Sequence, residues 1–226
     1  MAKVKVTWYG HAAFKVEIDD KEILFDPWFG NPKNPIKDVK IKKCDLICVT
    51  HGHGDHGVEE GVEVSKKTGA PIVAIFELAN YFKEKGANVI DMNIGGSTTV
   101  NGIKVYMTEA THSSPQGVPV GFIIEVGGVT IMHTGDTGLF GTMPMLGDLF
   151  NIDIAFLPIG DHYTMGPKLA AYACKQLKPK FVIPMHYGTF PVLTGTPEEL
   201  EKELKKQNVS TKMIVLNPGE TKEIEL

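Results

Sequence analysis

The sequence predicts a mixed α/β fold, and three observations lead to it. Strand-length apolar runs fill the N-terminal region, strands alternate with helices over residues 46–85, and glycine-containing hairpin signals follow in the middle of the chain. Hydrophobic residues make up 42% of the chain and charged residues 22%, which is ordinary for a globular protein. A chain of 226 residues can bury a sizeable core, and we expect a single domain over residues 1–226.

The N-terminal region is predicted to be a meander of three strands. These strands cover residues 3–8, 13–18 and 22–25. Gly10-His11 separates the first pair and Asp19-Asp20 the second, and both dipeptides favour turns. Two prolines within residues 31–35 then mark an irregular loop, because proline cannot donate to a strand ladder.

The central region is predicted to alternate strands with helices and then to continue as hairpins. A strand over 46–49 precedes a helix over 59–67, a strand over 72–75 and a helix over 77–85, with Gly69 and Gly86 closing the two helices. Further strands cover 89–92, 97–100, 103–108, 121–126 and 129–133. Asn101-Gly102 and Gly127-Gly128 are typical two-residue hairpin turns.

The C-terminal region is predicted to contain two helices between short strands. Residues 138–150 form an apolar loop in this prediction, either a pocket wall or, as we favour, ordinary core. Strands over 154–157 and 181–183 flank a helix over 167–177. Thr196-Pro197-Glu198-Glu199 is a capping box that starts the last helix, and strands over 212–216 and 221–225 follow.

The segment Thr50–His56 carries the densest set of reactive side chains in the chain. It follows the apolar run 46–49 and contains His51, His53, Asp55 and His56. Alternate residues of an extended segment point the same way, so His51 and His53 can face one ion while Asp55 and His56 face a second. A chance histidine-rich loop or a purification tag is the alternative, but a tag would be terminal and uninterrupted. The segment therefore indicates a metal site.

This pattern resembles the signature of the metallo-β-lactamase superfamily. The motif His-x-His-x-Asp-His after a strand is followed, in order, by His112, Asp136 and His186, each after a predicted strand, and it is preceded by Asp26. The resemblance spans residues 8–188 and implies a four-layer αββα sandwich. The segments 8–14 and 157–160 are similar to those of a compact subgroup of metal-dependent hydrolases, related to ascorbate-phosphate lactonases and more distantly to N-acyl-phosphatidylethanolamine phospholipases.

The resemblance implies a site with two divalent metal ions. His51, His53 and His112 would hold one metal, Asp55, His56 and His186 the other, and Asp136 would bridge them. Zinc is the expected metal, with manganese, iron and nickel as alternatives, because a bridging carboxylate is a harder ligand than cysteine. Two such ions share a hydroxide that can attack an electrophile.

Four further residues are assigned roles around this site. Asp26 is expected to accept the free N–H of a ligand histidine, as the resemblance implies, rather than to be a turn aspartate. His11 either contacts substrate or the second metal, or is a plain turn histidine. His162 either assists chemistry, by donating to an oxyanion or protonating a leaving group, or is an exposed loop histidine. His133 is expected to be a structural histidine in a strand.

Charge, cysteine content and the N-terminal residues indicate which partners and which cellular compartment to expect. The net charge of −4 provides no basic surface for nucleic acid, and the basic run 37–43 is expected to be a solvated loop. Three cysteines without disulfide or zinc-ribbon spacing favour a reducing compartment. The first residues lack a signal-peptide core, so we expect a cytoplasmic protein without a membrane span; a homo-oligomer is left open.

The function predicted from the sequence is metal-dependent hydrolysis of a small ester, lactone, amide or phosphodiester. A flavin-diiron redox protein is disfavoured, because that class carries glutamate where this chain has His53. A nuclease or RNA-processing phosphodiesterase would need a basic surface or an inserted domain. A non-catalytic metal-binding or regulatory protein is the remaining alternative, and the complete set of ligand positions argues against it.

Overall fold

Two seven-stranded sheets form the centre of the computed structural model, which describes residues 3–226. The first sheet runs in the spatial order β14 (Thr221–Glu225), β1 (Lys3–Gly10), β2 (Ala13–Ile18), β3 (Lys21–Phe25), β4 (Leu46–Cys48), β5 (Ile72–Ile75) and β6 (Val89–Met92). The second runs in the order β13 (Lys212–Met213), β12 (Phe181–Met185), β11 (Ile154–Pro158), β10 (Val129–His133), β9 (Val120–Val126), β8 (Ile103–Glu109) and β7 (Ser97–Val100).

The two sheets repeat one pairing scheme. In the first sheet β14, β1, β2 and β3 pair antiparallel, whereas β3 to β6 pair parallel. In the second sheet β7 to β10 pair antiparallel and β10 to β13 pair parallel. Strands β4, β5 and β11 are buried along their whole length, as expected for parallel strands covered on both faces.

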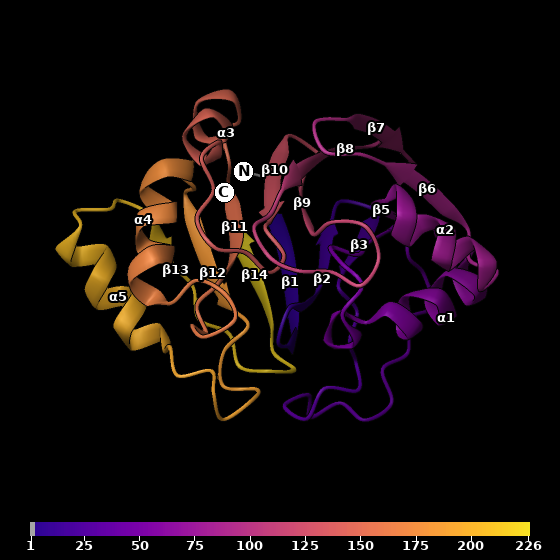
Figure 1. Cartoon of the computed structure of the whole chain (residues 1–226), viewed down its shortest axis with the longest axis horizontal. Coiled ribbons are helices and arrows are strands. Elements are labelled where there is room, and N and C mark those ends of the chain that lie inside the picture. The colour runs from indigo at the N-terminus through magenta and orange to yellow at the C-terminus, as the bar shows by residue number, and fades with distance from the viewer. Residues whose placement is uncertain (1–2) are drawn as a thin grey trace.

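Helices cover the outer face of each sheet. Helices α1 (Val58–Thr68) and α2 (Phe76–Glu84) lie beside the first sheet, while α3 (Met143–Leu149), α4 (Pro167–Leu177) and α5 (Pro197–Lys206) lie beside the second (Figure 1). The order of layers is helix, sheet, sheet, helix. The four-layer αββα sandwich expected from the sequence is confirmed.

Aromatic side chains fill the space between the sheets. Phe14 of β2 stacks on Phe156 of β11 with ring centroids 4.2 Å apart, and Phe25 of β3 lies 6.0 Å from the same ring. A second apolar cluster joins strands of the second sheet to its helices and includes Leu157 and Leu200. Burial of these large side chains contributes about 1.5–3 kcal/mol each relative to exposure. The Phe14, Phe25 and Phe156 contacts pack the two sheets against each other.

Residues 138–150 differ from the sequence prediction, because Met143–Leu149 forms helix α3 instead of a loop. Gly147 in the interior lowers the helix propensity of the segment, whereas Pro144 lies in the first turn, where proline is tolerated. Gly147 packs so closely on α4 that a Cβ there would lie 2.1 Å from the carbonyl oxygen of Gln176. Tertiary packing against α4 thus stabilises the helix. Met143 is buried, as we favoured for this segment, whereas Leu149 is 76% exposed.

The strand predicted over 212–216 is shorter in the structure. Strand β13 pairs with β12 only at Lys212 and Met213. The chain then leaves the second sheet for the first, where the N–H of Gly219 donates to the carbonyl oxygen of Trp8. This crossing between sheets ends the ladder early.

Across residues 3–226, none of the helices combines the length and apolar character that spanning a bilayer requires.

Candidate metal centre

The predicted ligands come together where strands from both sheets end. His51, His53, Asp55 and His56 follow β4 of the first sheet, and His11 and Asp26 follow β1 and β3. From the second sheet, His112, Asp136 and His186 follow β8, β10 and β12. The site therefore lies at one end of the sandwich and draws on both halves of the chain.

The first group of side chains consists of His51, His53 and His112. One ring nitrogen from each lies within 4.8 Å of the others. Nε2 of His51 is 2.9 Å from Nδ1 of His53, and the ring of His112 is 5.2 Å from each of those two rings. His51 and His53 thus point the same way, as the alternation of an extended segment predicts.

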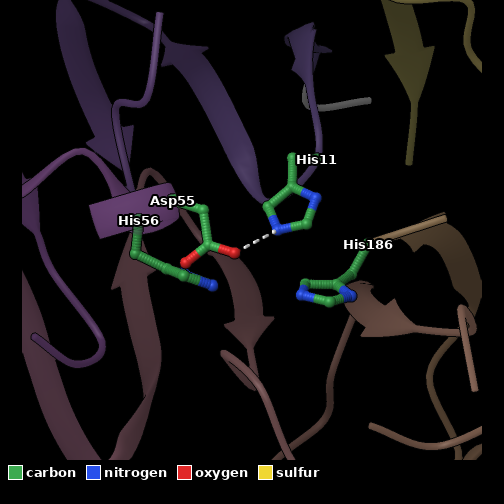
Figure 2. Close-up of side chains that lie close together, drawn as sticks. All are labelled: His11, Asp55, His56 and His186. Carbon is green, nitrogen blue, oxygen red and sulfur yellow. Dashed lines mark ion pairs between the residues drawn. The ribbon is translucent and has the colours of Figure 1, made fainter. Parts of the chain in front are cut away.

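The second group consists of His11, Asp55, His56 and His186, whose potential ligand atoms also lie within 4.8 Å of one another. Figure 2 shows the four side chains pointing toward a common space. The 3₁₀ turn η1 (Gly54–His56) directs Asp55 and His56 there, and Gly57 closes it at φ +70°. A Cβ on Gly57 would lie 2.3 Å from the backbone of Pro27, so glycine is required at this contact.

Asp136 lies between the two groups. Its Oδ2 is 2.9 Å from Nε2 of His186, 3.3 Å from Nε2 of His56 and 3.6 Å from Nε2 of His112. One potential ligand atom each from His51, His56 and Asp136 also falls within 4.8 Å. The carboxylate has the central position that the sequence resemblance implied for a bridging ligand.

Asp26 is buried beneath His56 and makes the contact expected from the sequence. Its Oδ2 accepts from Nδ1 of His56 at 2.7 Å, while the N–H and the hydroxyl of Thr50 both donate to the carboxylate at 2.8 Å. This hydrogen bond keeps a proton on Nδ1 of His56 and turns Nε2 toward Asp136. Asp26 thereby orients a potential ligand.

Several buried polar atoms at this site have no hydrogen-bond partner within residues 3–226. They are Nε2 of His11, Nε2 of His56, Oδ1 of Asp136 and Nδ1 of His186. Buried polar atoms are normally paired, and imidazole nitrogens with carboxylate oxygens form the donor set of zinc and similar ions. The residues present therefore fit divalent metal.

Burial and mutual charge set the protonation states at the site. Burial, with a smaller contribution from His56, holds the pKa of His51 well below its usual value. Burial also lowers the pKa of His11 to about 4. For Asp136 burial acts in the opposite sense, but His56 and His186 outweigh it and hold the carboxyl pKa well below normal. At His56 burial acts to lower the pKa, but Asp136 and Asp26 outweigh it and raise the pKa well above its ordinary value. A metal would therefore have to displace a proton from His56, whereas His51 and His11 are already neutral.

A cavity of about 390 Å³ opens onto the two groups. Its lining consists of His53, Gly54, Asp55, His112, Ser113, Asp136, Tyr163 and His186. Tyr163 is 56% exposed, and none of the other lining residues is a large hydrophobic residue. A small molecule in the cavity would contact candidate metal ligands as well as Tyr163.

Neither His162 nor His133 is among the residues within 3–226 that line the cavity. His162 is exposed, and its ring lies 4.5 Å from that of Tyr163. His133 is buried between the sheets, with Nε2 3.0 Å from the carbonyl oxygen of Ala12 and Nδ1 accepting from the N–H of Gly135. Both of its nitrogens are paired, so the structural role expected for His133 is confirmed.

Three residues that matter at the site carried little or no signal in the sequence. Thr50 holds Asp26 and lies 3.0 Å from Nδ1 of His51; its place directly before the histidine motif was the one available clue. Thr189 contacts His11 from a loop that follows β12. Tyr163 lines the cavity although its neighbour His162 had the stronger chemical signal.

Comparison with known proteins identifies similar chains. The model of the beta-lactamase superfamily domain matches residues 5–186. A "UPF0173 metal-dependent hydrolase" from Korarchaeum cryptofilum is 48% identical over 222 residues, which cover 98% of this chain and 100% of that protein.

Solved structures show the same fold at two levels of sequence similarity. Igni18, described as a novel metallo hydrolase from Ignicoccus hospitalis, superposes with a TM-score of 0.92 at 40% identity over 99% of both chains. CmlA, a diiron beta-hydroxylase from Streptomyces venezuelae, gives a TM-score of 0.75 at 13% identity over 100% of this chain and 54% of its own. The second likeness concerns the fold alone.

Proposed function

This chain belongs to the beta-lactamase superfamily, and from that membership we propose that it is a metal-dependent hydrolase with a dinuclear centre. The names of its relatives from Korarchaeum cryptofilum and Ignicoccus hospitalis support hydrolysis as the class of reaction. One observation carries the proposal. The two groups of candidate metal ligands lie on either side of Asp136, and Asp136 lines the cavity.

The residues would divide between two metals. His51, His53 and His112 would hold the first, Asp55, His56 and His186 the second, and Asp136 would be shared. Metals held in this way lower the pKa of a bound water toward neutrality and polarise the bond to be hydrolysed. Asp26 keeps a proton on Nδ1 of His56, so that Nε2 would be the nitrogen that binds.

The cavity favours a small substrate. A volume of about 390 Å³ is near the lower end of the range for small-molecule pockets. Tyr163 supplies an aromatic surface for the substrate, and the Ser113 hydroxyl can hydrogen-bond to it. Asp55 is 29% exposed at its side chain and lines the same cavity, so a substrate in the cavity would lie next to this ligand of the second metal. These features suit an ester, lactone, amide or phosphodiester.

The first test combines metal content with turnover. Untagged protein is stripped of metal, reconstituted separately with zinc, manganese, iron and nickel, and analysed for bound metal. The same samples are assayed for nitrophenol release from bis-nitrophenyl phosphate and from nitrophenyl acetate. We expect two metals per chain and turnover of at least one substrate. One metal or none, without turnover in any reconstituted sample, would contradict the proposal.

A further inference from the structure

His11 enters the metal centre from a backbone conformation that glycine normally adopts. Strand β1 ends at Gly10, with φ +102°, and His11 follows at φ +54°. A residue with a Cβ in this region costs roughly 1–2 kcal/mol. The His11 carbonyl oxygen accepts two hydrogen bonds, from Nε1 of Trp8 at 3.0 Å and from the N–H of His186 at 3.1 Å. These bonds hold His11 in place and fix it relative to His186.

The hydrogen bonds around the His11 ring indicate which nitrogen carries the proton. Nδ1 lies 3.0 Å from the hydroxyl oxygen of Thr189, and that hydroxyl donates to the carbonyl oxygen of Tyr187 at 3.5 Å. Because the Thr189 hydroxyl can donate to Tyr187, its oxygen is free to accept from Nδ1–H of His11, and we infer this tautomer. Nε2 then carries a lone pair.

The surroundings of Nε2 suit a cation. Nε2 is buried, 3.3 Å from Oδ2 of Asp55, yet it makes no hydrogen bond to any described residue. A lone pair facing a carboxylate oxygen is unfavourable unless a positive charge lies near both atoms. The His11 ring lies 3.9 Å from that of His186, and Figure 2 shows His11 pointing into the space it shares with Asp55, His56 and His186.

We propose that His11 is a ligand of the second metal, binding through Nε2 beside Asp55, His56 and His186. The inference rests on the proposed function, which requires a metal at this position. With the shared Asp136, the second metal has five side-chain ligands, whereas the first has His51, His53, His112 and Asp136. Five protein ligands exceed the four of tetrahedral zinc sites and suit ions that accept higher coordination numbers.

An alternative role for His11 is to donate an Nε2–H hydrogen bond to Asp55 and so to orient it. The two roles predict different behaviour of a glutamine at position 11. A glutamine side chain retains an N–H donor, so His11→Gln would preserve an orienting role, but it does not replace an imidazole ligand. His11→Gly removes the side chain and suits the φ of +54°.

The affinity test uses cobalt titration of metal-free protein, with bound metal measured by equilibrium dialysis. We compare the unsubstituted chain with His11→Gly, His11→Gln and the buried-histidine control His133→Gln. Both His11 variants should bind the first equivalent normally and the second about 100-fold or more weakly. The control should bind two equivalents. Retention of the second equivalent by His11→Gln would overturn the ligand role.

Anomalous diffraction from crystals of the metal-loaded chain gives a second readout. We expect a distance of about 2.0–2.2 Å from His11 Nε2 to the second metal. A metal more than about 3 Å from Nε2, with that nitrogen hydrogen-bonded to Asp55, would also overturn the inference. If the unsubstituted chain itself binds fewer than two metals, the proposed dinuclear function fails. If it binds two and His11 is not a ligand, the further inference alone fails.

Discussion

At the scale of single residues, the site concentrates unfavourable backbone conformations. Asp26 (φ +41°), His11 (φ +54°) and His186 (φ +56°) all occupy the left-handed region, and each contributes a side chain to the centre. Such residues persist where surrounding contacts determine the conformation, and they cluster at functional sites. These backbone conformations therefore lower the folding stability locally, while they orient three side chains toward the candidate metal centre.

Substitution of Asp136 tests the shared position directly. Asp136 contacts side chains from both metal-binding groups, so Asp136→Ala should lose both metals, with affinity reduced about 100-fold or more and activity reduced to background. Elemental analysis after dialysis measures the loss. Two tightly retained metals in this variant would rule out a bridging role for Asp136.

Tyr163 and His162 form a matched pair of neighbouring residues. Tyr163 lines the cavity, whereas His162 is exposed beside it. We expect Tyr163→Ala to raise KM about 10-fold through lost contact with the substrate, with unchanged metal content. His162→Ala should change KM and kcat less than about twofold. A large fall in kcat for His162→Ala at full metal content would instead support the chemical role that the sequence suggested.

His133 links stability to pH. Burial lowers the pKa of His133, so its ring is neutral in the folded chain and takes up a proton more readily when unfolded. This contribution to stability is present above about pH 6.5, the unfolded value, and is lost as the pH falls below it. When the pH is lowered from 7 to 5 in metal-free protein, the unfolding free energy of His133→Gln should fall less steeply than that of the unsubstituted chain.

The expected difference for His133 is at most about 1.4 kcal/mol per pH unit, the value for one proton. Urea unfolding of both proteins at several pH values measures it. The other buried histidines are common to both, so they cancel in the comparison. Equal slopes would show that His133 does not bind an additional proton on unfolding.

The sequence predicted which side chains the structure brings together as candidate ligands, because their order and spacing form a distinctive motif. Contacts made by Thr50 and Thr189 could not be predicted, since single threonines occur throughout the chain and nothing local marks the distant partner. The role of His11 was left open for the same reason. Whether its ring reaches the centre or stays in a plain turn depends on contacts with Asp55 and Thr189, which lie in distant segments of the chain.

At the scale of elements, helix α5 begins where local signals predicted. The Thr196 hydroxyl accepts from the N–H of Glu199, and the Glu199 carboxylate accepts from the N–H of Thr196. Thr196→Ala should lower the unfolding free energy by about 1 kcal/mol, measured by urea denaturation. Thr194→Ala, at an exposed position two residues earlier, is the control and should change it by less than about 0.5 kcal/mol. Equal effects would contradict the capping role.

Helix α3 shows the limit of local signals. Capping chemistry marks α5 within four residues, whereas α3 is stabilised by contact with α4, more than twenty residues further along the chain. Gly147 is typical of a loop when only the sequence is considered. The structural reason for glycine is its close approach to the backbone of Gln176, which is distant in the sequence. Elements that depend on distant packing are the ones that sequence periodicity misses.

At the scale of the whole molecule, metal should stabilise both halves together. The ligand set comes from the ends of strands in both sheets, so unfolding of either half would release metal. Binding to the folded state alone stabilises by about 4 kcal/mol at a metal concentration 1,000 times Kd. We therefore expect chelation to lower Tm by several degrees, measured by calorimetry. An unchanged Tm in protein shown to have lost its metal would contradict this linkage.

The repeated pairing scheme was partly foreseeable. Strand and helix signals occur in both halves of the chain, and three parallel pairings follow the antiparallel strands in each sheet. The prediction that two sheets pack face to face rested on the family resemblance. Periodicity identifies strands but does not specify which sheet each strand joins. The early end of β13 could not be predicted from periodicity, because it depends on the crossing of the chain from the second sheet to the first.

The pairing of β1 with β14 sets an order for folding during synthesis. Residues 3–7 of β1 pair with residues 221–225 of β14, so one edge of β1 has no native partner until residues 221–225 have left the ribosome. An unpaired strand edge can bind other chains. His11 directly follows β1 and His186 follows β12, so the candidate metal centre cannot be complete before residue 186 has been synthesised.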